Sequence, residues 1–547
     1  MKTLLLRRWK QRFGAWSVIS GIGAVLALLP SLYILAGLLG KPGENWAHIT
    51  EYMLLDYALE SLLLTGGTVV LASLAGIVLA WLTVAYDYPL RRFFSFVFLL
   101  PLAIPPYIAA YTYSSMLSYT GSVQTWLREM GVAVNQNYFD VMSMKGAIII
   151  FSLFLFPYVY LMVRSFLEKH SASFVESARL LGRNPLSVFF RVALPLSTGA
   201  VVGGASLVAF EVLNDYGVSK HFGLQTFTAA IFKTWFGMYD IDSALRLAAS
   251  LMALIIGIFV IERLLRRRKR YHIPANRSVP LTRRKLKGPV AWLAVIFSSF
   301  IALLSFFLPV VQLLIWAWWT FEDVWNEKFV GMLSNTLLVS CFTVVITMFF
   351  AVVASNVNRQ WRSPLSLTVG RLLSMGYSIP GAVLSIGVLA VFLSVDKRLA
   401  GVYAALGLGH NKLVLSMSLV MVVFAYSIRF LAVGYNAMDS GFDRIGNKYS
   451  EASRTMGNGM TATFFKVDLP LVKGAVLAGG IMVFLEVVKE LPLTLLLRPF
   501  NFDTLATKAY QYASDEQIHQ AALPSLLIIA LGIGSVCLYH WLGRRKS

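Results

Sequence analysis

The chain has 547 residues, of which 57% are hydrophobic and 14% are charged, with a mean hydropathy of +0.68. Because soluble domains usually carry about 25% charged residues, this composition excludes a water-soluble globular protein and indicates a membrane protein. The two cysteines, Cys341 and Cys537, exclude a disulfide framework and a zinc or iron–sulfur centre built within this chain. We interpret them as small core thiols, because both lie in apolar runs.

The formal net charge of +21 raises nucleic-acid binding as a hypothesis. The basic residues do not form one basic domain but lie in short loops between apolar runs, where the positive-inside rule places them in membrane proteins. We therefore interpret the charge as topological and expect no nucleic-acid partner. The N-terminal basic residues precede a long apolar run without an Ala-x-Ala site, which predicts a first spanning helix rather than a cleaved signal peptide.

Twelve apolar stretches are long enough to cross a membrane as helices, which takes about 20 residues. They predict an all-α fold, a polytopic transmembrane helical bundle. The sixth stretch is the weakest because it is short and begins beside Arg246, but without it the alternation of loop charges would break. In chain order the predicted spans are 16–39, 59–84, 93–114, 146–167, 194–213, 246–262, 290–319, 335–354, 371–395, 413–433, 472–497 and 522–542.

Alternate loops between these spans differ in charge. One set is rich in Lys and Arg and includes both termini, the loops 168–193 and 439–473, and the 263–287 loop with its eleven basic residues. The other set has fewer basic and more acidic residues. The basic set is predicted to face the cytoplasm, so both termini are expected inside. Within it, the run Arg266–Arg270 fits either a simple cytoplasmic anchor or a lipid headgroup site.

The two halves of the chain match without gaps at an offset of 275 residues, as where Ile104-Pro105 aligns with Ile379-Pro380. An offset that links six spans to six spans gives both halves the same orientation, unlike the inverted repeats of many carriers. The sequence therefore predicts two parallel six-helix repeats, 1–262 and 290–547, joined by a basic linker at 263–289.

The strongest motif lies in the basic loop between the fourth and fifth spans of each half, near 171–195 and 446–470. Each copy has a Glu followed by small residues, a Gly six positions after the Glu, and a Leu-Pro pair whose Pro lies nineteen positions after it. This pattern predicts a short helix, a glycine turn and the start of the next helix. The residues are Glu176, Ser177, Ala178, Gly182 and Pro195 in the first copy and Glu451, Ala452, Ser453, Gly457 and Pro470 in the second.

Both copies resemble the EAA loop in the permease subunits of binding-protein-dependent ATP-binding-cassette importers. Serines at two alanine positions and Val192 and Val467 in place of isoleucine are mild departures. The resemblance covers nearly the whole chain and implies the type I ABC importer permease fold. It also implies that each loop forms a coupling helix seated in a groove of an ATPase subunit. The implied ATPase-coupling residues are Glu176, Ala178, Gly182, Glu451, Ala452 and Gly457.

The chain has no G-x-x-x-x-G-K-[S/T] phosphate loop and no recognisable catalytic constellation. We therefore expect a transport subunit rather than an enzyme, and no cofactor in this chain. ATP and Mg would be bound by a separate cytoplasmic ATPase, in two copies because there are two loops.

Four carboxylates near the ends of the fifth and eleventh spans form a second feature. The pairs Glu211 with Asp215 and Glu486 with Glu490 each have i,i+4 spacing, which places them on one helix face if the helix continues. Carboxylates at membrane depth are costly, and a passing cation would relieve the cost. The alternative is that they cap helices at the membrane boundary or pair with Lys220 or Lys489. Both interpretations, a substrate pathway and a structural role, stay open from sequence.

The segments after the two loops, 213–217 and 489–507, resemble the ferric-iron branch of these permeases, fused twelve-span chains fed by a periplasmic or lipid-anchored binding protein. The resemblance implies a bacterial inner-membrane location. Ferric ion prefers hard oxygen ligands, so carboxylates suit it. Polyamine, thiamine, sulfate and phosphonate permeases share the fold and remain alternatives. An ion-gradient secondary transporter is a further alternative, against which the paired loops argue.

Overall fold

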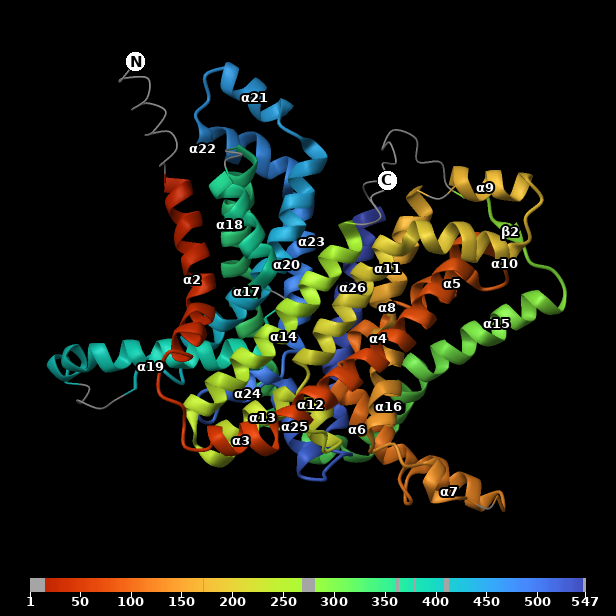
Figure 1. Cartoon of the computed structure of the whole chain (residues 1–547), viewed down its shortest axis with the longest axis horizontal. Coiled ribbons are helices and arrows are strands. Elements are labelled where there is room, and N and C mark those ends of the chain that lie inside the picture. Colours follow the sequence, from red (N-terminus) through yellow and green to blue (C-terminus); the bar gives the residue numbers. More distant parts are fainter. Residues whose placement is uncertain are drawn as a thin grey trace.

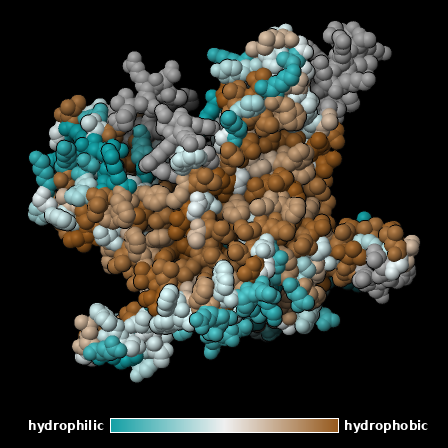
Figure 2. Space-filling view, turned by 180° about the vertical axis from the view of Figure 1, so that it is seen from behind, coloured by the Kyte–Doolittle hydropathy of each residue, from teal (hydrophilic) through white to brown (hydrophobic). Residues whose placement is uncertain are grey.

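The computed structural model describes residues 15–132, 134–170, 172–267, 281–360, 364–376, 379–407 and 413–544. The described chain is a helical bundle with a single two-stranded ladder (Figure 1). Figure 2 shows a hydrophobic band around the middle of one face, with hydrophilic residues gathered above and below it. This confirms the predicted polytopic membrane bundle, because an apolar belt between two polar ends is what a bilayer requires.

Nine helices among the described residues are long and apolar enough to cross a membrane. The weak sixth span is one of them, since its helix begins earlier than predicted and has 27 residues. Three of the nine join shorter elements through a wide turn. The main helices are α2 (Ala15–Gly37), α4 (Leu54–Ala85), α8 (Met144–His170), α11 (Leu194–Asn214), α14 (Ile241–Arg267), α15 with α16 (Pro289–Ala302 and Leu308–Val324), α17 (Glu327–Gln360), α20 (Leu419–Ile445) and α23 (Leu469–Val488).

The predictions of straight third and ninth spans were wrong, because both break at the repeated Ile-Pro pair. The two arms of the third span are bent by 94°. A proline pushes the residue before it out of the helical region, and Ile104 is extended. Pro105 and Pro380 then adopt nearly the same backbone, with ψ 139° and 144°. The arms are α5 (Arg91–Val97), η1 (Leu100–Ala103) and α6 (Pro106–Leu117) in the first half and α18 (Pro364–Met375) and α19 (Gly381–Ala405) in the second.

The eleventh span ends earlier than predicted and the twelfth has a short apolar part. The eleventh ends at Val488, and a separate helix α24 (Pro492–Leu497) follows. The twelfth is α26 (Ala522–Arg544), whose described apolar part, 522–538, is below the usual spanning length. The predicted core placement of Cys341 and Cys537 was also wrong, since both thiols are free and exposed.

Three spans contain one wide turn of π type directly before a Leu-Pro pair. Proline has no N–H to donate, and its ring crowds the carbonyl of the preceding turn. Widening that turn lets the helix continue without a break. The turns are η3 (Phe189–Ala193), η5 (Leu303–Phe307) and η7 (Phe464–Asp468), before Pro195, Pro309 and Pro470.

The core of each half is a three-helix group, α4, α8 and α11 in the first and α17, α20 and α23 in the second. Glycines at equivalent positions let these helices approach closely. A Cβ on Gly204 would lie 2.6 Å from the Val159 Cα, and one on Gly479 would lie 3.0 Å from the Ala437 Cβ. At these two positions the absence of a side chain therefore serves helix packing.

Only part of the basic linker can be described, because residues 268–280 lie outside the described residues, as do the N-terminal basic residues, Arg545 and Lys546. After the gap the chain forms β2 (Arg284–Lys285), which pairs in parallel with β1 (Tyr86–Asp87) after α4. The described end of the linker is therefore fixed to the first half. The remaining short elements are α3 (Trp46–Tyr52), α7 (Ser122–Glu129), η2 (Gln136–Tyr138), α9 (Ala172–Leu180), α10 (Pro185–Val188), α12 (Gly217–His221), α13 (Phe227–Phe232), η4 (Lys233–Gly237), α21 (Lys448–Thr455), α22 (Met460–Thr463) and α25 (Leu505–Ser514).

Candidate functional site: two hairpins and a charged cavity

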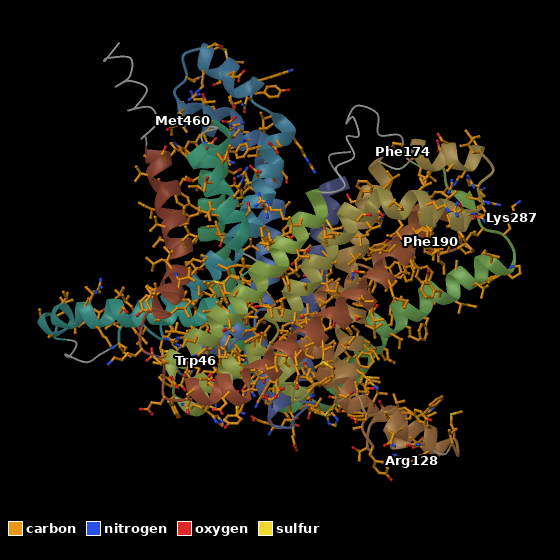
Figure 3. All side chains as sticks on the ribbon, in the orientation of Figure 1. Trp46, Arg128, Phe174, Phe190, Lys287 and Met460 are labelled. Atoms are coloured by element: carbon orange, nitrogen blue, oxygen red, sulfur yellow. The ribbon has the colours of Figure 1, made fainter. Side chains whose placement is uncertain are left out.

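Two short helical hairpins stand at one end of the bundle, at the top of Figure 1. The first consists of α9, a turn and α10, and the second of α21, a turn and α22. Figure 3 labels Phe174 on the first hairpin, Phe190 in the wide turn η3 directly after it, and Met460 on the second hairpin. Both hairpins therefore lie where the sequence places the paired loops, and both face away from the hydrophobic band.

A glycine in the left-handed region makes each turn. Gly182 has φ +75° and Gly457 has φ +89°, a conformation that residues with a Cβ adopt at a cost. The N–H of Gly182 donates to the Arg179 carbonyl and that of Gly457 to the Arg454 carbonyl, each at 3.0 Å. These are helix-terminating turns closed by a C′ glycine. The two motif glycines thus have the same geometric role.

Large apolar side chains are exposed on both hairpins. Leu180 and Leu181 are 88% and 81% exposed, and Met456 is 76% exposed. Side chains of this kind that project from a polar end, outside the hydrophobic band, mark an interaction surface. Glu451 and Ala452 are exposed as well, whereas Ala178 is buried. Ala178 therefore packs against its own chain and is not accessible to a partner.

The first hairpin is bound to the linker by a set of contacts that we call the linker clamp. It consists of Glu176, Arg179 and Thr282 together with the β1–β2 pair. The backbone N–H of Thr282 donates to the Glu176 carboxylate at 3.2 Å, and its hydroxyl donates to the same oxygen. The Arg179 guanidinium donates to the Thr282 carbonyl at 2.7 Å. Hydrogen bonds from Thr282 stabilise the ionised form and lower the pKa of Glu176. The structure gives the equivalent carboxylate of Glu451 no such partner within the described residues.

The second hairpin is held by a buried network instead, which we call the Asp468 network: Arg359, Ser450 and Asp468. Arg359 forms an ion pair with Asp468 at 2.7 Å, and the Ser450 hydroxyl donates to Asp468 at 2.5 Å. All three are buried, and the Arg359 guanidinium also lies 4.5 Å from the Phe442 ring centre. At the equivalent positions the first half has Val84, Val175 and Ala193, all buried and apolar.

The four candidate pathway carboxylates all line one cavity of about 60 Å³ between the halves, near the break at Ile104-Pro105. Their convergence is what the repeat predicts, since each half supplies one pair. Two cationic side chains, both from the second half, line it too. Four carboxylates against two cations leave a formal excess of negative charge. The charged lining residues are Glu211, Asp215, Arg429, Glu486, Lys489 and Glu490.

The predicted placement of Asp215 and Glu490 on the same helix face as Glu211 and Glu486 was wrong. The helix α11 ends at Asn214 and α23 ends at Val488, so the second carboxylate of each pair lies beyond its helix. Asp215 accepts the Val218 N–H at 2.8 Å and Glu490 accepts the Leu493 N–H at 3.2 Å. Both act as caps of the next short helix, α12 or α24. This was the structural alternative left open by the sequence.

Both cationic side chains of the cavity form ion pairs with carboxylates of the second half. Lys489 forms an ion pair with Glu486 at 2.9 Å, and Arg429 forms one with Glu490 at 2.8 Å. Glu211 accepts from the Tyr158 hydroxyl at 3.4 Å. Within the described residues, no group of three His, Cys, Asp or Glu side chains is arranged to hold a metal ion. Among the described residues, the cavity is thus a charged cavity without a formed metal centre.

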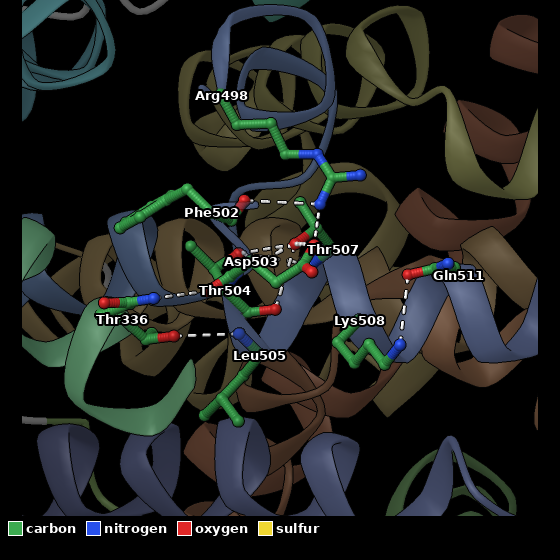
Figure 4. Close-up of polar contacts among 10 residues, drawn as sticks. Thr336, Arg498, Phe502, Asp503, Thr504, Leu505, Thr507, Lys508 and Gln511 are labelled. Carbon is green, nitrogen blue, oxygen red and sulfur yellow. Dashed lines mark hydrogen bonds and ion pairs between the residues drawn. The ribbon is translucent and has the colours of Figure 1, made fainter. Parts of the chain in front are cut away.

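The segment after α24, at the opposite end of the bundle, is a rigid polar turn (Figure 4). Arg498 forms an ion pair with Asp503, and Thr504 caps α25 in a reciprocal capping box with Thr507. The Leu505 N–H donates to the Thr336 hydroxyl at 2.9 Å, as the Phe227 N–H at the start of α13 does to the Ser61 hydroxyl at 3.0 Å. Ser61 and Thr336 are equivalent in the repeat, so both halves fix this end in the same way.

Sequence reasoning missed Thr282, Arg359, Asp468, Arg429 and Lys489 as parts of these sites. Asp468 had one signal, because it stands in the motif where the first half has Ala193. Lys489 was considered only as a possible structural partner. The other three are polar residues whose importance depends on contacts with segments far away in the sequence.

Comparison with known proteins matches two segments, 69–271 and 344–547, to the family "Binding-protein-dependent transport system inner membrane component". The matches begin 275 residues apart, which agrees with the repeat offset. The chain is 26% identical to the Fe(3+)-transport system permease protein FbpB 2 of Haemophilus influenzae over 83% of each chain. It is 28% identical to a probable sulfate transport permease cysT of Nephroselmis olivacea over 26% of this chain and 48% of that protein. Against the molybdenum permease ModB of Escherichia coli it is 27% identical, over 27% of this chain and 62% of that protein.

Proposed function

Because this chain belongs to the family of binding-protein-dependent transport system inner membrane components, it is a multi-pass permease of an ABC importer, and we propose that its cargo is ferric iron. A relative matched over 83% of both chains carries Fe(3+) in its name. Relatives named for sulfate and molybdenum match only about a quarter of this chain. The lining of the cavity supports a cationic cargo rather than an oxyanion, since its carboxylates outnumber its cations.

The single observation that carries the transport proposal is the pair of hairpins with matched glycine turns at one end. Each hairpin offers exposed apolar side chains on a helix that is anchored to the bundle, which suits a groove of an ATPase subunit. We assign one cytoplasmic ATPase copy to each hairpin. Gly182 and Gly457 shape the turns, Glu451 and Ala452 face the ATPase, and Glu176 and Ala178 hold the first hairpin to its own chain.

This assignment places the hairpin end in the cytoplasm, together with both termini and the linker 263–289. The substrate-binding protein then docks at the opposite end, where capped short helices such as α13 and α25 form a firm surface. ATP-driven closure of the two ATPases would move the hairpins and, through α11 and α23, the two halves 1–262 and 290–547. The cavity between the halves opens outward and then inward in turn. ATP and Mg stay on the ATPase.

Ferric ion suits the cavity because hard trivalent cations prefer oxygen ligands. Glu211, Asp215, Glu486 and Glu490 would form a negatively charged path rather than a permanent site. A tetrahedral oxyanion would instead meet four carboxylates at short range, which is costly at membrane depth.

The test is uptake of labelled ferric ion, sulfate and molybdate by cells with and without the gene, in a strain that lacks other iron systems. Ferric uptake should require the gene and should fall at least tenfold when Glu451→Arg and Met456→Glu are combined, with normal amounts of protein in the membrane. Gene-dependent uptake of an oxyanion but not of iron would refute the cargo. Normal iron uptake by the double variant would refute the docking role of the hairpin.

A further inference from the structure

Lys489 stands where the first half has Asn214, and a difference in the facing backbone accounts for the change. The equivalent residue is Asn214, whose side-chain oxygen accepts the N–H of Gly381 at the start of α19. By the same symmetry, residue 489 would face the start of α6, but Pro106 stands there and has no N–H to donate. An acceptor at position 489 would have no donor to meet. The position is therefore free to carry a cation toward the cavity.

The Lys489 ammonium lies among the carboxylates of both halves. It pairs with Glu486 at 2.9 Å and also interacts electrostatically with Glu211 and Glu490. Its side chain is 15% exposed and lines the cavity. A lysine has a flexible four-carbon stem and a compact charge, so it can swing between partners.

Arg429, the other cation, is built differently. Its guanidinium and the Glu490 carboxylate are each only 6% exposed, and Glu490 also caps α24. Releasing Arg429 would leave a fixed carboxylate buried without its partner, which is strongly unfavourable. Of the two cations, Lys489 is the one that can leave its carboxylate.

The cavity lining also includes the Tyr107 hydroxyl, an oxygen that has no hydrogen-bond partner among the described residues. The Tyr107 hydroxyl is buried, makes no hydrogen bond within the described residues, and interacts electrostatically with Asp215 and Glu490. A buried polar atom without a partner is costly unless something else satisfies it. A phenol oxygen is a hard donor of the kind that a trivalent cation prefers.

We propose that the Lys489 ammonium is a built-in counter-cation that competes with the cationic cargo for Glu486 and Glu211. When the cavity is empty, the ammonium neutralises these carboxylates. A trivalent ion displaces it and takes up the carboxylates together with the Tyr107 hydroxyl, and the ammonium returns when the ion leaves. This keeps weakly charged cations out of the cavity, because they compete poorly with the tethered charge. The inference rests on the proposal that the cargo is a cation.

The experiment measures Tb³⁺ binding, a hard trivalent probe, to the purified full chain in lipid nanodiscs by luminescence sensitised through nearby tyrosines. Lys489→Asn, which copies the first half, should tighten binding at least tenfold. Lys489→Arg should restore the wild-type affinity. Lys220→Asn, which removes a positive charge at an exposed position, is the matched control and should not change it.

Unchanged or weaker binding by Lys489→Asn would overturn the inference, as would the absence of tight binding by every variant. If Lys489→Asn does not fold, Glu486→Gln provides the test: it should weaken Tb³⁺ binding at least tenfold, and an unchanged affinity would refute the competition. Because binding is read without transport, loss of the ferric-iron assignment in the uptake assay would leave a positive Tb³⁺ result standing. The two proposals can therefore fail separately.

Discussion

The hairpin ends of the two halves have the same backbone but are held by different side chains. Both have a short helix, a left-handed glycine, a second short helix and a wide turn before Leu-Pro. The first is tied from outside by the linker clamp, whereas the second is held from inside by the Asp468 network. The linker's described end reaches only the first half, so only the second needs an internal anchor. Both halves thus have the same glycine turn, whereas the contacts that hold each hairpin to the bundle differ.

Of the changes predicted here, removing Arg359 should have the largest effect on stability, and it should act on the second half only. Arg359→Met leaves the Asp468 carboxylate buried without its counter-charge, which costs about 3–5 kcal/mol. We expect a large fall in the thermal unfolding temperature of the detergent-purified chain and loss of the second hairpin's order. Changing Val84, the equivalent residue, to Met is the matched control and should cost less, as an overpacking change of about 1–3 kcal/mol.

Replacing the Asp468 network with apolar residues like those of the first half tests whether the two halves can be anchored in the same way. The triple change Arg359→Val, Ser450→Val and Asp468→Ala removes all three members of the Asp468 network at once. Replacing a buried ion pair with apolar groups is often neutral or stabilising, so we expect stability within about 2 kcal/mol of the wild type. A loss as large as that of Arg359→Met alone would contradict the interpretation of the network as an alternative anchor.

The glycine turns should respond equally in both halves. Gly182→Ala and Gly457→Ala each force a Cβ into the left-handed region, at a cost of about 1–2 kcal/mol. ATPase stimulation in the reconstituted complex should fall for both variants, by similar factors. A strong effect in one half only would show that the turns do not share one role.

The linker clamp should give the smallest effect and only in the first half. Thr282→Val removes the hydroxyl that donates to Glu176, a hydrogen bond at an exposed site worth about 0.5 kcal/mol. Hydrogen exchange in α9 should become faster, while exchange in α21 stays unchanged. Equal acceleration in both helices would mean that the clamp is not local.

Lowering the pH should weaken the linker clamp, because it protonates Glu176. The pKa of Glu176 is lowered in the folded protein, so its contribution is fully present above the ordinary carboxyl pKa and is lost as pH falls through the lowered value. Corrected for intrinsic rates, α9 protection should decline below about pH 4 and should do so less in Thr282→Val. The α21 helix is the internal control, because the Glu451 carboxylate accepts no comparable hydrogen bond from the described residues.

The sequence was sufficient for features that depend on local chemistry or on long patterns. Apolar runs located most spans, and the Glu-to-Gly and Glu-to-Pro spacing located both hairpins and their turns. It was insufficient where a short motif overrides a pattern, as at Ile104-Pro105 and Ile379-Pro380, which lie inside apolar runs and yet break the helix. The end of the fifth span was predicted within one residue of Asn214, whereas the end of the eleventh was predicted too late, at 497, because apolar composition continues past Val488.

Anchors and counter-charges could not be foreseen because they join distant segments. Thr282 reaches Glu176 across 106 residues, and Arg429 reaches Glu490 across 61. Neither spacing has a periodic signature. The four carboxylates were recognised because the repeat doubles them, but their division into caps and ion-paired residues became visible only in three dimensions.

The most direct test of the account is the number of ATPase subunits that each chain binds. Leu181→Cys and Met456→Cys, introduced singly into a chain without Cys341 and Cys537, place a cross-linker on one hairpin at a time. We predict that each variant captures the partner ATPase and that native mass spectrometry gives one chain with two ATPase copies. Capture through only one hairpin, or a complex with a single ATPase per chain, would contradict the claim that the two differently anchored hairpins do the same work.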